Sequence, residues 1–416
     1  MSDPSVAQFL ADARSWLDVN LLLRKDAGGS IEPGDPFSTA VFHALTFAEE
    51  ESLLSELRTW NRMRAERGYH AIAAPMDDGG LGLSREYDRA YARLESEYET
   101  PARHELFSVT RQLIAPTVRE FGDADQRREF VGSLLRTDVY CCQLFSEPSA
   151  GSDLASVACR AVRDGDAWVV NGQKVWSSGA QFAEWGELIA RTDPGAPKHR
   201  GLTAFLVPMH LEGIEVRPIP QMSGGSSFNE VFFTEVRVPD RLRLGPVGGG
   251  WQVALTTLGF ERDHSAVAAR AGGTWEQVRA TARAQGRLDD PVIRQELMKL
   301  LIHLRVEEMV NRRAADLRAA GVTPGPEGSL GKLLWTEGMR KMSDVVSRLV
   351  GPGLVADSGR WATYEWGEHV LGAPGYRIAG GSDEIQRTII GERVLGLPPE
   401  PRVDKDQPWS SSRQVR

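Results

Sequence analysis

The sequence predicts an α+β protein of three parts: an N-terminal α-helical domain, a small middle β-barrel domain and a C-terminal four-helix bundle. Two observations support this order. Apolar residues recur at helical spacing in the first and last parts, whereas the part between them consists of short runs rich in β-branched and aromatic residues. We place the domains at 1–138, 139–244 and 245–400, followed by a mobile polar tail at 401–416. A chain of 416 residues is long enough for several cores.

The N-terminal part is predicted to be a helical scaffold. Its clearest segment, "FHALTFAEEESLLSELRTWNRMRAERG", ends at Gly68 and carries apolar residues at helical spacing: Phe47, Leu53, Leu54, Leu57 and Trp60. The segments "REYDRAYARLESEYE" and "FSVTRQLIAPTVREFG" continue the pattern.

The middle part changes character near residue 140. In "AWVVNGQKVWSS", two short extended runs flank Asn171-Gly172, a pair that is typical of a tight hairpin turn. The runs "LTAFLVP", "IEVRPIP" and "EVFFTEVRVP" follow, and proline separates them. These runs predict a small β-domain.

Helical spacing returns at Trp251. The pattern beginning there breaks near Gly272-Gly273, and a second helix carries an apolar face of Leu297, Leu300, Leu301, Leu304 and Met309. A third helix, "LGKLLWTEGMRKMSDVVSRLVG", ends at Gly351. We assign the fourth helix to "GYRIAGGSDEIQRTIIGERVLGLP", residues 375–398, which completes a bundle.

Composition excludes several classes of protein. The net charge of −8 and the absence of a basic stripe argue against nucleic-acid binding. The three cysteines, Cys141, Cys142 and Cys159, lack metal-ligand spacing, so we expect reduced, buried thiols and no metal site. The N-terminus lacks the pattern of a signal peptide, and no stretch is apolar enough to span a membrane. We therefore expect a cytoplasmic protein.

Two motifs flank the first strands of the middle part. "QLFSEPSAGSD", residues 143–153, offers hydroxyl groups and a glycine, which suits the polar edge of a flat cofactor but also an ordinary turn of small residues. In "NGQKVWSSG", Trp176 and Ser178 are two residues apart and share a face if they lie on a strand. An indole wall beside a hydroxyl suits a planar redox ring, and a core tryptophan is the alternative.

A third motif lies near the C-terminus. Gly380 and Gly381 precede Ser382 and Asp383 at the expected start of a helix. Glycines before a capped helix start allow backbone N–H groups to face an anion. The motif is therefore a candidate site for a phosphate or an oxyanion.

Together, "SEPSAGSD", the tryptophan motif and "GGSDEIQR" before "GERVLG" resemble the acyl-CoA dehydrogenase family of flavoenzymes, and the resemblance covers nearly the whole chain. It implies bound FAD, an acyl-CoA substrate, an electron-transfer flavoprotein as acceptor, a role in fatty acid and lipid metabolism, and a homotetramer or homodimer. It also implies FAD contacts from these residues: Phe145, Ser146, Ser152, Trp176, Ser178, Gln295, Gly351, Gly353, Ser382 and Glu384. Ser152 approaches either the cofactor phosphates or the thioester.

The family's reaction needs a carboxylate that removes the α-proton and an oxyanion hole for the thioester oxygen. Many members carry the base at the position of Gly380, which has no side chain here. In the isovaleryl-CoA and long-chain branches, the base is a Glu on the first bundle helix, directly before an Arg. Glu261-Arg262 matches that placement, so Glu261 is the expected base, with Arg262 anchoring the helix. The N–H of Gly380 remains available as an oxyanion donor.

The chain departs from the family pattern in the bundle. Ala282 occupies the position of an Arg that reaches the neighbouring subunit's FAD, and Gln285-Gly286 replaces an aromatic-Gly pair. Arg283 and Arg287 are the nearby replacements, and these changes put the contacts between subunits in doubt. "MSGGSSFNEVFF" also lacks the family's usual Arg before the strand, and Pro352 is an uncommon residue between the glycines of "GPG".

Two alternatives stay open. The first is a flavin oxidase of the same fold, acting on an acyl-CoA or a nitroalkane. The second is a non-catalytic partner subunit of a heteromeric dehydrogenase, which the altered 282–295 region makes credible.

Overall fold

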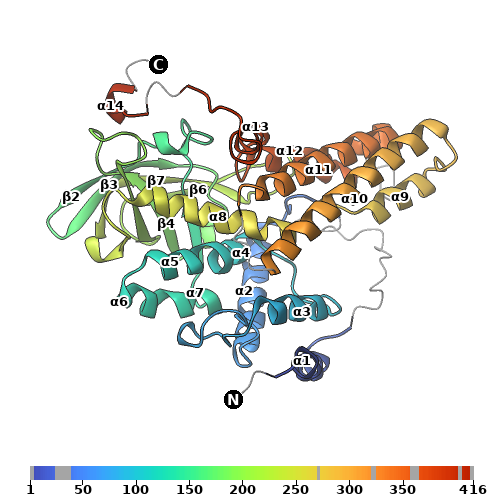
Figure 1. Cartoon of the computed structure of the whole chain (residues 1–416), viewed down its shortest axis with the longest axis horizontal. Helices are drawn as coiled ribbons and strands as arrows, with labels where there is room; N and C mark the ends of the chain where they lie inside the picture. The colour runs from blue at the N-terminus through green and yellow to red at the C-terminus, as the bar shows by residue number, and fades with distance from the viewer. Residues whose placement is uncertain are drawn as a thin grey trace.

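The computed structural model describes residues 4–23, 39–268, 272–319, 325–356, 365–401 and 405–412, without the side chains of 261–268, 318–319, 365 and 412. Helices, a β-domain and a helical bundle follow one another along the chain (Figure 1). The predicted fold class is confirmed in this order.

The N-terminal part consists of helices that begin at clear caps. The Thr46 side chain accepts a hydrogen bond from the backbone N–H of Glu49, and the backbone N–H of Thr46 donates to the Glu49 carboxylate. This reciprocal pair is a capping box, and it starts the second helix. The same helix buries the predicted apolar residues Leu53, Leu54, Leu57 and Trp60. The helices are α1 (Val6–Asn20), α2 (Phe47–Ala65), α3 (Arg85–Glu95), α4 (Glu105–Ser108), η2 (Val109–Ile114), α5 (Ala115–Phe121), α6 (Ala124–Gln126), η3 (Arg127–Val131) and α7 (Gly132–Arg136).

The middle part is one mixed sheet with the strand order β6-β7-β3-β2-β4-β5-β8, and β1 pairs with β4. Within the described residues, β6 and β8 are the two ends of this path. The strands are β1 (Cys141–Leu144), β2 (Arg160–Asp164), β3 (Ala167–Lys174), β4 (Trp185–Arg191), β5 (Leu202–Pro208), β6 (Ile214–Ile219), β7 (Phe228–Pro239) and β8 (Arg243–Leu244). All three cysteines are free and buried.

The expected hairpin turn at Asn171-Gly172 is wrong. Strand β3 runs through both residues, and the β2–β3 hairpin turns at Gly165 and Asp166 instead. The Asn-Gly pair forms a bulge in the β3–β7 ladder, where the register shifts between Val170 and Gly172. A bulge, like a turn, makes use of the backbone freedom of glycine, and Gly172 has φ +151°. The Asn-Gly pair therefore marked an irregular backbone correctly but not its type.

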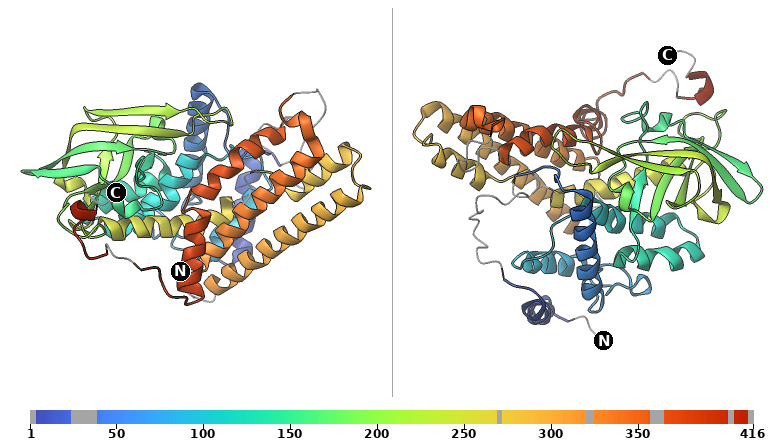
Figure 2. Two further views of the ribbon diagram at one scale, coloured as in Figure 1. Left: turned by 90° about the horizontal axis from the view of Figure 1, so that it is seen from above. Right: turned by 180° about the vertical axis from the view of Figure 1, so that it is seen from behind.

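The C-terminal part is helical. Its helices are α8 (Gly250–Ala268), α9 (Trp275–Ala284), α10 (Pro291–Ala319), α11 (Gly328–Val350), η7 (Gly351–Leu354), α12 (Glu365–Ile378), α13 (Asp383–Ile389) and η8 (Ile390–Val394). Helices α9, α10, α11 and α12 lie side by side (Figure 2). Apolar residues of all four share one core, among them Val278, Leu297, Val346 and Trp366.

The fourth bundle helix begins ten residues before the stretch to which we assigned it and overlaps only its first four residues. Helix α12 begins at Glu365 and ends at Ile378, before the two glycines, although Pro374 lies inside it. Between the glycines and residue 398, the described helical elements are the short α13 and η8. The glycines therefore form a loop at the end of the fourth helix.

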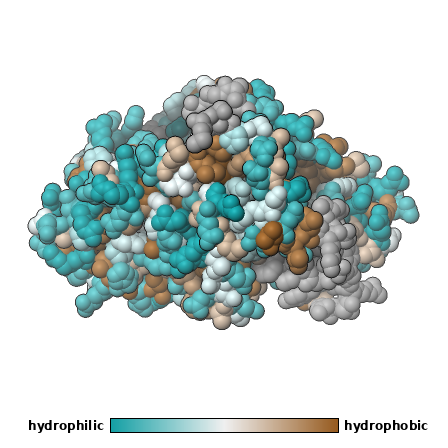
Figure 3. Space-filling view, turned by 90° about the horizontal axis from the view of Figure 1, so that it is seen from below, coloured by the Kyte–Doolittle hydropathy of each residue, from teal (hydrophilic) through white to brown (hydrophobic). Residues whose placement is uncertain are grey.

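Helix α8 connects the parts, because it runs beneath the sheet toward the bundle (Figure 1). The main core combines residues of η2, α5 and α8 with the inner residues of the sheet, including Ile114, Val118, Phe205 and Val253. On the face shown in Figure 3, hydrophobic residues form small separate groups among hydrophilic ones. In the described ranges, none of the helices has the length and apolar character needed to cross a membrane.

The last described segment, residues 405–412, lies against the middle part (Figure 1). Pro408 forms a bridge with Pro197, and the N–H of Trp409 donates to the carbonyl of Ala196 over 2.9 Å. The Trp409 ring lies under the guanidinium of Arg191, 4.6 Å away. Residues 405–412 of the expected mobile tail are thus in contact with the body of the protein.

Candidate functional site

The loop after β1 is held by a buried ion pair. Lys174 Nζ donates to Glu147 Oε1 over 2.8 Å and to the carbonyl of Phe145 over 2.9 Å. The carboxylate of Glu147 also accepts from the backbone N–H groups of Ala158 and Cys159, over 2.7 and 2.8 Å. Lysine and glutamate are rarely this buried unless paired, so the pair gives the "SEPSAGSD" loop a defined shape.

The tryptophan motif meets this loop directly. The N–H of Val175 donates to the carbonyl of Ser146 over 2.9 Å, which joins two motifs that lie about thirty residues apart in the chain. Strand β3 ends at Lys174, so Trp176 and Ser178 do not share a strand face as the sequence predicted. Trp176 has φ +62° and its side chain is 59% exposed. Ser146 and Ser178 are half-buried, and Ser152 is exposed.

The glycine motif forms an ordered loop after α12. Gly380 and Gly381 have φ +62° and +83°, a region that favours glycine. Gln386 Nε2 donates to their two carbonyls over 2.9 and 3.2 Å. Ser382 caps α13 by accepting from the N–H of Ile385. With the carbonyls held by Gln386, the loop has a fixed conformation.

The residue after the cap anchors this loop to the bundle. Asp383 is buried and accepts from Arg377 Nε over 2.8 Å, Thr336 Oγ1 over 2.8 Å and Lys332 Nζ over 3.3 Å. Burial opposes ionisation, but these donors leave the pKa of Asp383 below its ordinary value. Glu384, the next residue, is exposed and lies 3.8 Å from Arg387.

A row of aromatic rings links the tryptophan motif to the glycine motif. The ring of Trp176 meets Phe228 edge-on at 6.1 Å, and Phe228 meets Phe42 at 5.3 Å. Phe42 stacks on Tyr376 of α12 at 4.9 Å, four residues before Gly380. The three parts of the chain therefore meet here, and sequence reasoning missed these phenylalanines because isolated aromatic residues carry no motif.

Helix α8 carries the expected base. Glu261 and Arg262 belong to α8, but their side chains lie outside the described residues. The preceding turn is anchored: Thr257 Oγ1 donates to Glu187 Oε1 over 2.8 Å and lies 2.9 Å from Thr117 Oγ1. Burial raises the pKa of Glu187 to about 8. This anchor fixes the helix four residues before Glu261.

The remaining predicted residues lie in the bundle. Gln295 is exposed on α10, and Gly351 and Gly353 lie in η7. The side chain of Ala282 is buried in the bundle core, so this departure from the family pattern serves packing within the chain.

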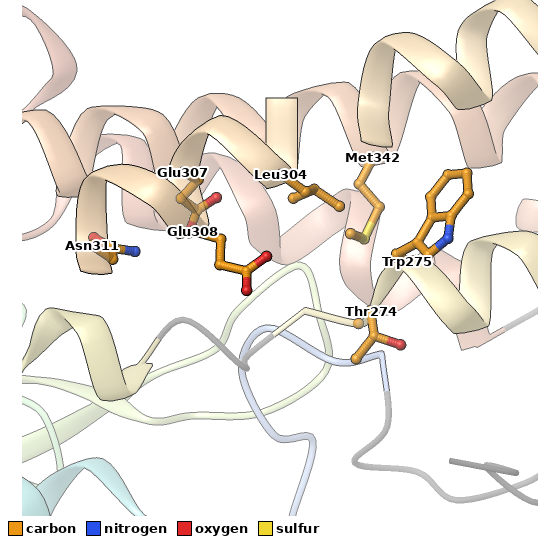
Figure 4. A pocket seen from close by; sticks show the side chains of 8 residues that line it. Thr274, Trp275, Leu304, Glu307, Glu308, Asn311 and Met342 are labelled. Atoms are coloured by element: carbon orange, nitrogen blue, oxygen red, sulfur yellow. The ribbon is translucent and has the colours of Figure 1, made fainter. Parts of the chain in front are cut away.

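A separate pocket of about 220 Å³ opens between α9, α10 and α11. Glu307, Glu308 and Asn311 line one end, and Trp275 and Met342 line the other (Figure 4). Burial raises the pKa of Glu307 to about 7. The pocket contains none of the residues predicted for the flavin or the substrate, and it is smaller than most cofactor sites.

Comparisons with known proteins agree with the motifs. The family model "Acyl-CoA dehydrogenase, middle domain" matches residues 142–236, and "Acyl-CoA dehydrogenase, C-terminal domain" matches residues 248–395. The chain belongs to the acyl-CoA dehydrogenase family. It is 37% identical to acyl-CoA dehydrogenase IpdE1 of Mycobacterium tuberculosis, over 95% of this chain and 98% of that protein. It is 28% identical to the human mitochondrial short-chain specific acyl-CoA dehydrogenase, over 79% and 80%.

Solved structures of this family share the fold. A variant of the Tcur3481-Tcur3483 steroid ACAD has a TM-score of 0.73 and 25% identity, over 95% of this chain and 99% of that chain. The ChsE4-ChsE5 complex from Mycobacterium tuberculosis has a TM-score of 0.69 and 25% identity, over 96% and 99%. A glutaryl-CoA dehydrogenase from Mycobacterium smegmatis, solved with FADH2, has a TM-score of 0.65.

The residues of this acyl-CoA dehydrogenase fit a flavin at the joined motifs. The indole of Trp176 is exposed, and its backbone has a positive φ that residues other than glycine rarely adopt. In the next residue, Ser177 Oγ is a buried atom that has no hydrogen-bond partner among the described residues. A planar group with polar edges, laid against the indole, suits this combination of an apolar wall and an unused polar atom.

Proposed function

We propose that this protein catalyses the FAD-dependent α,β-dehydrogenation of an acyl-CoA thioester to the trans-2-enoyl-CoA. The observation that carries the proposal is the junction of the two family motifs, where Val175 N–H meets the Ser146 carbonyl beside the exposed Trp176. FAD, when bound, accepts the hydride from the β-carbon of the substrate. Phe145, Ser146, Trp176 and Ser178 are the residues that we propose hold its ring system.

In this proposal, Glu261 removes the α-proton of the substrate, and Arg262 anchors that end of α8. The N–H of Gly380 donates to the thioester oxygen, a contact that is commonly worth about 3 kcal/mol in the transition state. The glycine at position 380 supports this assignment, because the position where many members carry the base has no side chain here. Ser152, Ser382, Glu384, Gln295, Gly351 and Gly353 are further proposed contacts to FAD or CoA.

The relatives guide the proposal for the substrate, and the acceptor is proposed from the resemblance to the family. We propose a bulky acyl group, since one structural neighbour at 25% identity is a steroid ACAD. Electron-transfer flavoprotein is the proposed acceptor. Rapid mixing of the reduced protein with air tests the oxidase alternative, because prompt reoxidation of the flavin would identify an oxidase.

Replacing Glu261 tests the mechanism. Glu261→Gln should slow the bleaching of the flavin by acyl-CoA at least about a hundredfold, because the α-proton loses its base. Anaerobic titration against a panel of acyl-CoAs, at equal flavin content, measures the effect. Asp263→Asn, two residues further along α8, is the matched control and should bleach at the parent rate. Equal bleaching by Glu261→Gln and the parent would place the base elsewhere.

A second candidate function is that of one subunit in an assembly of two different proteins. Two structural neighbours, Tcur3481-Tcur3483 and ChsE4-ChsE5, are complexes of this kind. Ala282, at the position where most members place an Arg toward the neighbour's FAD, favours an altered contact between subunits. A colourless preparation of this chain alone that gains flavin with a second protein would support this candidate, whereas a yellow homotetramer would exclude it.

A further inference from the structure

The segment that carries Trp176 and Ser178 has no ladder of its own. It leaves β3 at Lys174 and turns through two residues of positive φ, Trp176 at +62° and Gly179 at +64°. A tryptophan in this region costs free energy on the order of 1–3 kcal/mol, so the surroundings must hold it there. We therefore asked which side chains do so.

Asn229 of β7 holds the segment from behind. It is fully buried, and its Nδ2 donates to the carbonyl of Ser177 over 3.0 Å. Its own backbone carbonyl accepts from the N–H of Ser177 over 3.1 Å, and the neighbouring Ser227 carbonyl accepts from Gly179 over 2.9 Å. Asn229 therefore hydrogen-bonds both the N–H and the carbonyl of Ser177, which fixes the two peptide groups between Trp176 and Ser178.

The amide of Asn229 is itself oriented. Its Nδ2 also donates to Gln181 Oε1, and Gln181 Nε2 donates to Glu50 Oε2 and to the carbonyl of Ser226, each over 3.3 Å. Glu50 belongs to α2 of the N-terminal part and is buried. A chain of hydrogen bonds therefore runs from α2 through Gln181 and Asn229 to the tryptophan motif.

The histidines beside Glu50 complete this chain. His104 Nε2 lies 2.7 Å from Glu50 Oε1, and His43 Nε2 lies 3.5 Å from it. These three residues have metal-ligand types, and their ligand atoms lie within 4.8 Å of one another. However, His104 Nδ1 accepts the N–H of Leu106 over 3.1 Å, so a neutral ring carries its proton on Nε2. That nitrogen donates to Glu50 and is not free to bind a metal, so the cluster acts as a hydrogen-bonded anchor.

We propose that Glu50, Gln181 and Asn229 form a positioning relay, which holds the Trp176–Gly179 segment in the conformation that receives the flavin. The inference rests on the proposed function, because it assigns these residues to the flavin side of the same site. The relay acts through the backbone of Ser177 and touches neither cofactor nor substrate in the proposed mechanism. It makes the flavin wall of the middle part depend on a carboxylate of the N-terminal part.

Replacing Asn229 by leucine removes the donors and keeps the branching of the side chain. In Asn229→Leu, the amides of Ser177 and Gly179 should exchange hydrogen about tenfold faster, because a lost buried hydrogen bond typically costs on the order of 1–3 kcal/mol. Affinity for FAD should fall about tenfold. The fold-decrease in kcat should be larger than the fold-change in the KM for acyl-CoA. Mass-spectrometric exchange, flavin titration and steady-state kinetics measure these three effects.

Asn61→Leu is the matched control. Asn61 is equally buried and donates to the carbonyl of Leu135 and to Thr137, within the N-terminal part. This variant should lower the melting temperature without changing exchange at Ser177 or the flavin affinity. Equal effects of the two variants on exchange and flavin affinity would show general destabilisation and overturn the relay.

A reciprocal exchange provides a rescue. Gln181→Glu alone places two carboxylates face to face and should loosen the segment as Asn229→Leu does. Adding Glu50→Gln restores a donor between the two positions, and exchange at Ser177 and Gly179 should return to within about threefold of the parent. Failure of the double variant to recover would refute the relay. If the parent binds no FAD, the proposed function fails, while amide exchange still decides whether the relay holds the segment.

Discussion

At the residue scale, the ion pair between Lys174 and Glu147 bears most directly on the site. Both side chains are almost fully buried, and together they satisfy the carbonyl of Phe145 and two backbone N–H groups. The pair therefore stabilises the loop in which Ser146 receives the N–H of Val175. A buried ion pair contributes little more to the stability of the folded state than two apolar side chains of similar volume. Removing one partner, however, leaves a buried unpaired charge and strongly destabilises the folded state.

Lys174→Met should lower the free energy of unfolding by about 3 kcal/mol, because it leaves the Glu147 carboxylate buried without its cation. FAD affinity should fall with it, since Phe145 loses the donor to its carbonyl. Thermal unfolding and flavin titration measure both effects. Arg237→Met, which breaks the exposed pair with Asp164, is the control and should leave the melting temperature nearly unchanged. Similar losses in the two variants would contradict this account.

At the element scale, helices α10 and α11 pack around the carboxyl group of Glu307, for which the described residues provide no ion pair. Glu307 on α10 is 8% exposed, and its Oε2 lies 3.4 Å from the point where Gly338 of α11 would carry a Cβ. Burial raises its pKa from 4.5 to about 7. Gly338 thus permits the close approach of α10 and α11 at Glu307, and the resulting burial favours the protonated form of this acid.

The raised pKa of Glu307 gives the stability of the protein a pH dependence. An acid whose folded pKa is raised destabilises the folded state progressively as pH rises from about 4.5 to about 7. Glu307→Gln should therefore match the parent near pH 4.5 and exceed its free energy of unfolding by up to about 3 kcal/mol above pH 7. Melting temperatures across this range measure the difference. The exposed Glu308→Gln should show no such trend, and a flat difference for Glu307→Gln would disprove the assignment.

At the scale of the whole molecule, the site exists only where the three parts meet. Phe42 comes from the N-terminal part, Trp176 and Phe228 from the middle part, and Tyr376 from the bundle. The C-terminal segment also returns to the middle part, where Trp409 Nε1 donates to the carbonyl of Ser156 over 3.3 Å. Ser156 lies three residues after Asp153, where the first motif ends. Residues 405–412 therefore contact the chain just after this motif, next to Arg191.

Trp409→Ala should release residues 405–412 from the middle part, because the segment loses its ring contact with Arg191 and its bond to Ser156. Limited proteolysis should then cleave the chain after residue 401 about tenfold faster, while the melting temperature changes little. Lys405→Ala, at an exposed position of the same segment, should be cleaved at the parent rate. Unchanged protection in Trp409→Ala would show that the contact does not hold the tail.

Local patterns were sufficient for the order of the parts and for the motifs. Leu53, Leu57 and Trp60 recur at helical spacing, and the structure buries them on one helix. Asn171-Gly172 shows the limit of such patterns, because the backbone freedom of glycine serves a turn and a bulge equally and the pairing of β3 with β7 decided between them. A proline inside a helix removes a backbone hydrogen bond, yet α12 contains Pro374 and covers the bundle core through Trp366.

By itself, the sequence determined the fold class, the family and the motifs on which the proposed flavin site rests, because periodicity and motifs are properties of neighbouring residues. Only the tertiary structure decided how the marked residues are held. The pairing of Lys174 with Glu147, the hydrogen bonds from Glu50 to Asn229 and the aromatic row from Trp176 to Tyr376 join residues far apart in the chain. Contacts of this kind depend on how the three parts pack, and no local pattern encodes them.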